Sequence, residues 1–113
     1  MEYQLTRHDD IQLVTILADK IVHANADGFK TVMIDLIHKG GNRILMDLSK
    51  VGFIDSRGLG VLISLFKSLG PGGLLSLCAV NDNVCKVFEV TKLDRVFSVH
   101  PDVESGLQAM QAR

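Results

Sequence analysis

The sequence predicts an α/β domain with a mixed, mainly parallel sheet and four helices packed on it. Short apolar segments alternate with amphipathic ones along most of the chain, which is typical of βαβ units. The chain opens with two strand-like segments around Asp9-Asp10, a turn signal, and this predicts an antiparallel hairpin at the edge of the sheet. With 113 residues we expect one domain, residues 1–113.

The elements are expected in the order β-β-α-β-α-β-α-β-α. In the first strands, apolar residues alternate so that one face is drier than the other. The helices are marked by apolar residues at helical spacing, and the first two are ended by glycine-containing turns. The predicted strands cover 2–8, 11–17, 43–48, 74–80 and 97–99; the predicted helices cover 27–39, 56–69, 82–93 and a last segment opened by Pro101, with 49–55 as a short connection.

The composition does not favour binding through bulk charge. Hydrophobic residues make up 47% and charged residues 22% of the chain, and the formal net charge is −1. Contacts to nucleic-acid phosphates need clustered Lys and Arg, whereas the twelve basic residues here are scattered. The N-terminal segment has no apolar signal region, and the apolar runs are too short for a membrane span. We therefore expect a cytoplasmic protein that binds no nucleic acid directly.

Cysteine, histidine and aspartate show no spacing typical of a metal site or an enzyme. Cys78 and Cys85 match no common zinc or redox motif, so we expect reduced thiols in or near the core. The aspartates do not repeat at the spacing of a calcium-binding loop. Ser56 is not flanked by the glycines of a nucleophile elbow, G-x-S-x-G. A Ser-His-Asp triad made of residues distant in the sequence stays open as an alternative. The sequence predicts no catalytic residue, no metal ligand and no cofactor.

The most informative stretch is DLSKVGFIDSRGLGVL, residues 47–62. A buried strand ends there, and a short connection brings Asp55 and Ser56 to the start of a helix, where backbone N–H groups are unpaired. Ser56 has two possible roles at this position. Its hydroxyl can cap the helix, or it can accept a phosphate whose charge the helix start tolerates.

The helix that follows Ser56 is expected to present a surface for another protein. Projection at about 3.6 residues per turn places Leu59, Leu62, Ile63, Phe66 and Leu69 on the core face. Gly58 and Gly60 cost helix stability, which either a flat docking surface or tight packing on a neighbouring loop explains. The predicted partner-binding surface contains Ser56, Arg57, Gly58, Gly60, Val61 and Ser64, with Leu65 at its edge.

The 47–62 stretch resembles the signature of STAS domains, most closely that of the bacterial anti-sigma factor antagonists. The resemblance is carried by Asp-Leu-Ser-x-Val-x-Phe-Ile-Asp-Ser-x-Gly-Leu-Gly-Val-Leu, and by Ala-Val-Asn at 79–81 and the Phe88, Leu93, Phe97 pattern. Chain length and element order agree over nearly the whole chain. The resemblance therefore implies a STAS fold.

The resemblance also implies a partner switch. In such systems the unphosphorylated protein binds a serine kinase that also inhibits a downstream regulator, often a sigma factor. Phosphorylation releases the kinase, and a PP2C-type phosphatase resets the switch. Carried over to this chain, the acceptor is Ser56, and its neighbour Asp55 can orient the hydroxyl and repel an added phosphate.

One position departs from the family pattern. Many relatives have a second Ser or Thr directly before the glycine, where this chain has Arg57. We favour Ser56 as acceptor because Arg57 can pair with a phosphate beside it. Three alternatives stay open. The output can be a non-sigma process such as biofilm or exopolysaccharide control, the domain can sense a small ligand or nucleotide at the Gly58-Leu59-Gly60 helix start, and the chain can form a homodimer.

Overall fold

A five-stranded mixed sheet forms the centre of the molecule, in the order β1-β2-β4-β6-β7. The computed structural model describes residues 1–111. β1 is antiparallel to β2, and every other neighbouring pair is parallel, as predicted. The strands are β1 (Tyr3–His8), β2 (Ile11–Ile16), β4 (Arg43–Asp47), β6 (Leu74–Cys78) and β7 (Ser98–His100).

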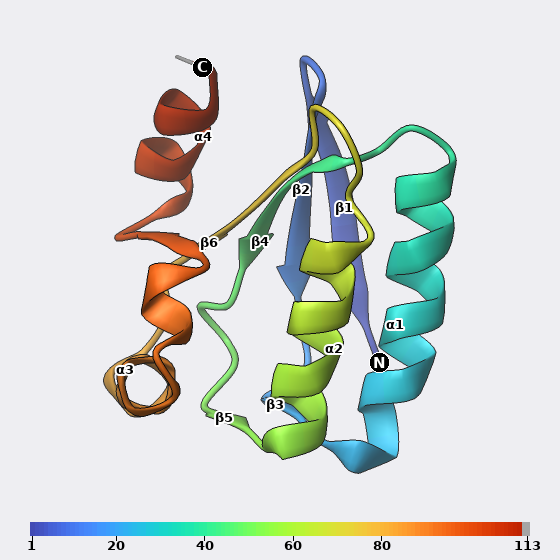
Figure 1. Cartoon of the computed structure of the whole chain (residues 1–113). Coiled ribbons are helices and arrows are strands. Elements are labelled where there is room, and N and C mark those ends of the chain that lie inside the picture. The colour runs from blue at the N-terminus through green and yellow to red at the C-terminus, as the bar shows by residue number, and fades with distance from the viewer. Residues whose placement is uncertain (112–113) are drawn as a thin grey trace.

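Four α-helices cover the sheet, and a short 3-10 turn precedes β7. α1 and α2 lie side by side on one face, and α4 packs across β4, β6 and β7 on the other (Figure 1). α3 contacts β5 and the 3-10 turn. The helices are α1 (His23–His38), α2 (Ser56–Lys67), α3 (Asp82–Thr91) and α4 (Val103–Gln111), and the 3-10 turn is η1 (Leu93–Arg95).

The sheet is buried on both faces. Val14 and Ile16 of β2 belong to the main core, which the inward sides of α1, α2 and α3 complete. Ile11 of the same strand belongs to a second, smaller core under α4, together with Leu45, Cys78 and Met110. The prediction that one face of β2 is more buried than the other is therefore wrong, because α4 covers the face opposite α1 and α2.

A second sheet of two short parallel strands was not predicted. β3 (Lys20–Ile21) pairs with β5 (Phe53–Ile54), and β5 lies inside the segment expected to be a plain connection. Two residues are too few to show a strand period, so this pairing is invisible in the sequence. It has a consequence for function, because the N–H of Asp55 donates to the Ile21 carbonyl at 3.2 Å and thereby fixes where α2 begins.

α1 begins one turn earlier than predicted, at His23 instead of Asp27. Its N-cap is Val22, a residue whose side chain cannot accept a hydrogen bond. The start is held by two other groups: the Asn25 side chain accepts the Val22 N–H at 2.8 Å, and the Asp55 carboxylate accepts the His23 N–H at 3.0 Å. The second contact spans 32 residues, so no local pattern announces this helix start.

Candidate functional site

Ser56 is the first residue of α2, and its side chain is exposed. The N-cap is Asp55, whose carboxylate accepts the Gly58 N–H at 2.9 Å. Ser56 therefore does not cap the helix, which removes the structural role considered for it. Within residues 1–111 its hydroxyl has no hydrogen-bond partner. The loop presents this hydroxyl to the surroundings at the positive end of a helix dipole.

Asp55 holds the beginnings of two helices together. One carboxylate oxygen accepts the Gly58 N–H of α2, and the other accepts the His23 N–H of α1. The hydrogen bond from Gly58, followed by that from His23, lowers the pKa of Asp55 below its usual value. Asp55 therefore carries a negative charge next to Ser56. Its oxygens point to backbone donors, and within the described residues it makes no bond to the Ser56 hydroxyl, contrary to the expected orienting role.

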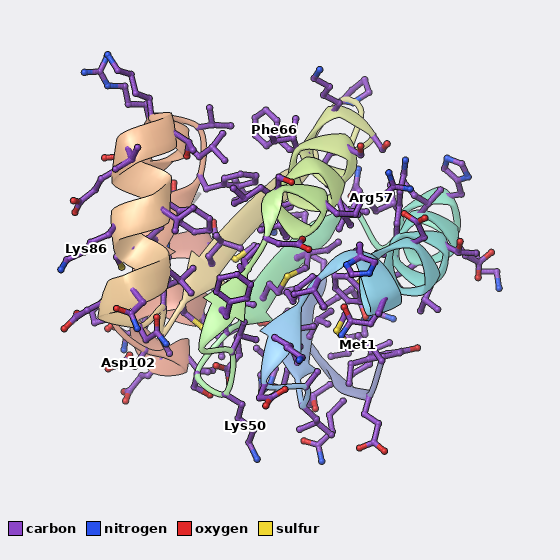
Figure 2. All side chains as sticks on the ribbon, turned by 90° about the horizontal axis from the view of Figure 1, so that it is seen from below. Met1, Lys50, Arg57, Phe66, Lys86 and Asp102 are labelled. Carbon is purple, nitrogen blue, oxygen red and sulfur yellow. The ribbon has the colours of Figure 1, made fainter. Side chains whose placement is uncertain are left out.

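Arg57 crosses from α2 to α1. Its Nε donates to Asp27 Oδ1 at 3.0 Å and its Nη2 donates to Asp27 Oδ2 at 2.7 Å, a bidentate ion pair. In Figure 2 Arg57 lies between the two helices. The side-chain hydrogen bonds of this pair lower the pKa of Asp27 and raise the pKa of Arg57. In this structure the partner of Arg57 is thus a carboxylate of α1.

An open groove between α1 and α2 contains most of the predicted surface. Ser56, Arg57 and Gly60 line it, and so do Val61 and Ser64. The wall formed by α1 contributes His23, Asp27 and Lys30. Sequence reasoning missed these three residues of α1, since they lie about 30 positions upstream and only the packing of α1 on α2 brings them to Ser56.

The two glycines near the start of α2 have different roles. A Cβ on Gly58 would lie 2.4 Å from the Ile21 carbonyl oxygen and 2.8 Å from Ile54 Cγ2, so only glycine lets α2 approach β3 and β5 this closely. A Cβ on Gly60 would meet nothing within 4 Å. The packing explanation therefore holds for Gly58, which is buried, and the surface explanation remains for Gly60, which is exposed.

Val61, which was placed on the outer face of α2, and Leu65, which was placed at the edge of that face, are buried instead. Val61 is 3% exposed and Leu65 is fully buried, within the core that contains Ala26 and Phe29 of α1. The projection assumed that α2 packs only on the sheet, whereas it packs on both the sheet and α1. Conversely, Phe66 was expected in the core and is 39% exposed, with its ring in a T-shaped contact with the ring of Phe97.

The described residues also bear on the other sequence expectations. Both cysteines are free thiols; Cys78 is buried and Cys85 half-buried, as expected. Within residues 1–111, no three His, Cys, Asp or Glu side chains gather closely enough to hold a metal ion. Over the same residues, every helix is too short or too polar to cross a bilayer.

Comparison with known proteins identifies the family. The family model for the STAS domain matches residues 2–106. The chain therefore belongs to the STAS domain family, which confirms the resemblance found in the 47–62 stretch.

Individual relatives agree with this assignment. The chain is 37% identical over 91 residues to a Thermotoga neapolitana protein named as a candidate anti-sigma factor antagonist, covering 79% of this chain and 80% of that one. It is 28% identical over 101 residues to the anti-sigma-B factor antagonist of Bacillus subtilis, covering 88% and 90% of the two chains. The crystal structure of a candidate antagonist from Thermotoga maritima superposes with a TM-score of 0.88 at 30% identity, covering 96% and 94%.

Proposed function

We propose that this chain is a phosphorylation-controlled protein-binding switch of the anti-sigma factor antagonist type, and that it is not an enzyme. The observation that carries the proposal is the exposed Ser56 hydroxyl at the start of α2, left without a structural task because Asp55 caps the helix. The names of the relatives support the class of function. In the unphosphorylated state the chain binds a serine kinase of the anti-sigma type and so frees the regulator which that kinase inhibits.

Phosphorylation at Ser56 needs little rearrangement of the domain. The Ser56 oxygen attacks the γ-phosphate of the kinase's ATP, its hydroxyl proton passes to a basic group of the kinase, and ADP leaves. The product carries a charge of about −1.5 to −2 at the N-terminus of α2, where the helix dipole favours anions. The phosphoprotein therefore stays folded, and a PP2C-type phosphatase can hydrolyse the exposed phosphate.

Release of the partner follows from the cost of burying that charge. Ser56, Arg57, Gly60 and Ser64 form the accessible part of the docking surface, because Gly58, Val61 and Leu65 are buried. A phosphate enclosed between two proteins loses its hydration, which is costly unless the partner supplies cations. The nearby negative charge of Asp55 adds repulsion. The regulator that is freed can be a sigma factor or a protein of a non-sigma pathway such as biofilm or exopolysaccharide control.

Phosphosite mapping tests the proposal. The protein is purified from its native cell with phosphatases inhibited and analysed by mass spectrometry, beside Ser56→Ala and Ser64→Ala variants. Ser64 is a matched control, since it is a serine on the same helix and lines the same groove. We expect phosphate on Ser56 in the wild type and in Ser64→Ala. Protein without phosphate on Ser56 under every growth condition would contradict the switch.

Binding to the kinase, once it is identified, tests the direction of the switch. Ser56→Ala is expected to bind it constitutively, whereas Ser56→Asp is expected to bind poorly. Equal binding by the two variants would contradict release by charge.

A further inference from the structure

The Arg57–Asp27 ion pair joins the two walls of the groove beside the proposed phosphorylation site. Its two hydrogen bonds measure 3.0 and 2.7 Å, and they hold the guanidinium plane against the carboxylate. Both side chains remain in contact with solvent, at 59% and 62% exposure. Arg57 follows Ser56 directly in the chain, and the two residues line the same groove as Asp27.

Among the cationic groups that line this groove, Arg57 has the side chain best suited to bind a phosphate. Lys30 and His23 of α1 also line it. The carboxylate of Asp55 is taken up by the two backbone N–H groups of His23 and Gly58. A guanidinium can bind a phosphate in the same bidentate way in which it binds Asp27, whereas the Lys30 ammonium offers only a point charge.

We propose that Arg57 changes partner when Ser56 is phosphorylated, leaving Asp27 and pairing with the phosphate. The inference rests on the proposed function, because the exchange takes place in the cell only if Ser56 is phosphorylated there. It adds a second element to the switch, because phosphorylation then changes the wall formed by α1 as well as the start of α2.

The exchange is favourable for two physical reasons. The phosphate carries about −1.5 to −2 charges against −1 on Asp27, so its attraction for the guanidinium is stronger. The pair that must break is exposed, and exposed ion pairs contribute little to stability. The backbone of α2 need not move, since the arginine side chain is long enough to change rotamer while its Cα stays in place.

The exchange alters the charge on both walls of the groove. In the unphosphorylated state Arg57 neutralises Asp27, so the α1 wall carries the charge of Lys30 and, when protonated, of His23. After the exchange Asp27 has lost the guanidinium that neutralised it and keeps the charge of Lys30 nearby, and it faces a phosphate that Arg57 only half neutralises. A partner that fits the first state therefore meets negative charge from both helices in the second.

The test uses phosphoserine placed at position 56 during translation from a reassigned stop codon, so that no kinase or partner is needed. The second pKa of the phosphate is measured by ³¹P NMR titration. His23→Gln serves as the background because it removes an ionisable side chain that lines the groove, while the backbone N–H at position 23 that donates to Asp55 is kept. Asp27→Asn, Arg57→Gln and the double variant are compared in that background. Lys67→Gln removes a cation from the last turn of α2 as a matched control.

We expect Arg57→Gln to raise the phosphate pKa by about 0.3 pH unit or more, because the cation that favours the dianion is lost. Asp27→Asn is expected to lower it by nearly the same amount whether Arg57 is present or replaced, because Asp27 no longer holds a guanidinium that its loss could release. The double variant measures this, since the direct effect of the Asp27 charge is common to both pairs. Lys67→Gln should leave the value unchanged.

Two outcomes would overturn the exchange. One is an unchanged phosphate pKa in Arg57→Gln, and the other is a clearly larger fall caused by Asp27→Asn with Arg57 present than with Arg57 replaced, which would show that Asp27 still holds Arg57. Either result leaves the proposed phosphorylation of Ser56 untouched, since the phosphate is installed independently of the cell. Conversely, an unmodified Ser56 in the native cell would contradict the proposed function, but it would not change the results of these titrations.

Discussion

The Asp55 carboxylate accepts the backbone N–H of His23 at 3.0 Å and thereby ties the start of α1 to the start of α2. Its other oxygen caps α2 through Gly58. One side chain thus satisfies donors at the starts of two helices, and these donors, His23 and Gly58, lie more than thirty positions apart in the chain. This holds the exposed Ser56 where the starts of the two helices meet, in the same groove as His23, Asp27 and Lys30 of α1.

Replacing Asp55 with alanine should destabilise the protein more than the loss of an ordinary cap. Two backbone N–H groups lose their acceptor, and we expect the Tm to fall by roughly 4 to 8 °C. Asp102→Ala is the matched control, since Asp102 accepts a single backbone bond, from Ser105 at the start of α4. Thermal unfolding followed by circular dichroism gives both values. Equal losses in the two variants would show that the bond to His23 contributes nothing.

Stability should fall when the solution is acidified below the usual aspartate range. Hydrogen bonds hold the pKa of several carboxylates low: Asp10 from Arg43, Asp27 from Arg57, Asp55 from Gly58 and Asp102 from Ser105. Their pKa is lower in the folded than in the unfolded chain, so between the two values the unfolded chain binds more protons. Their stabilisation is complete above the unfolded value of about 3.9 and is lost as pH falls through the folded values.

Urea unfolding between pH 7 and pH 2 measures this effect. We expect a nearly constant midpoint down to about pH 5 and a steep fall below about pH 4. Asp55→Asn should start from a lower midpoint and lose less on acidification, because one of the contributing charges is already absent. A midpoint that rises on acidification would reverse the sign of the linkage.

Alanine at the two glycines of α2 should have opposite effects on stability. Gly58→Ala places a methyl group against the Ile21 carbonyl and is expected to cost about 1–3 kcal/mol or more, because backbone must shift. Gly60→Ala meets no atom within 4 Å and should stabilise the helix by about 0.5–1 kcal/mol. Urea unfolding measures both. A stable Gly58→Ala variant would contradict the close approach of α2 to β3.

Gly60→Ala also tests the docking surface. The added methyl group lies on the groove beside Ser56, so we expect weaker binding of the kinase by a protein that is at least as stable as the wild type. A change at an exposed site of α3, Val90→Ala, serves as the control and should leave binding unchanged. Titration calorimetry gives both affinities. Unchanged binding by Gly60→Ala would move the interface away from this groove.

The two thiols should differ in reactivity. Burial, with the charges of Asp47 and Asp102, raises the pKa of Cys78 to about 12, and its side chain is fully buried. Cys85 is half-buried, so its thiol is the more accessible. At pH 8 we expect iodoacetamide to label Cys85 at least about 10-fold faster than Cys78, with Cys78 reacting only on unfolding. Peptide mapping by mass spectrometry assigns the sites, and equal labelling of both would contradict the buried position.

The elements that sequence predicted best are those with many residues in one periodic pattern. The five strands of the main sheet and the last three helices lie near their predicted positions, and the parallel order follows from the alternation. The β3–β5 pair and the first turn of α1 were missed. The first is a pairing of two residues with two, and the second depends on a hydrogen bond from the His23 N–H to a distant carboxylate; neither leaves a local pattern in the sequence.

Within the candidate site, the sequence predicted the α2 side of the groove correctly but not which of its side chains are buried. The 47–62 stretch pointed to Ser56 and its neighbours, and the structure places Ser56, Arg57, Gly60 and Ser64 along the groove. Helical spacing showed which side chains share a face, but it could not show that two neighbours cover α2. Val61 and Leu65 are therefore buried where an outer face was expected.

By itself the sequence determined the fold family, the order of the elements and the position of Ser56 at a helix start, because these depend on residue patterns within one segment. Only the tertiary structure decided that Asp55 and not Ser56 caps α2, that Gly58 packs while Gly60 faces outward, and that Asp27 holds Arg57. These outcomes depend on the approach of α1 and β3 to α2. That approach is set by the packing of the whole core, and no single segment encodes it.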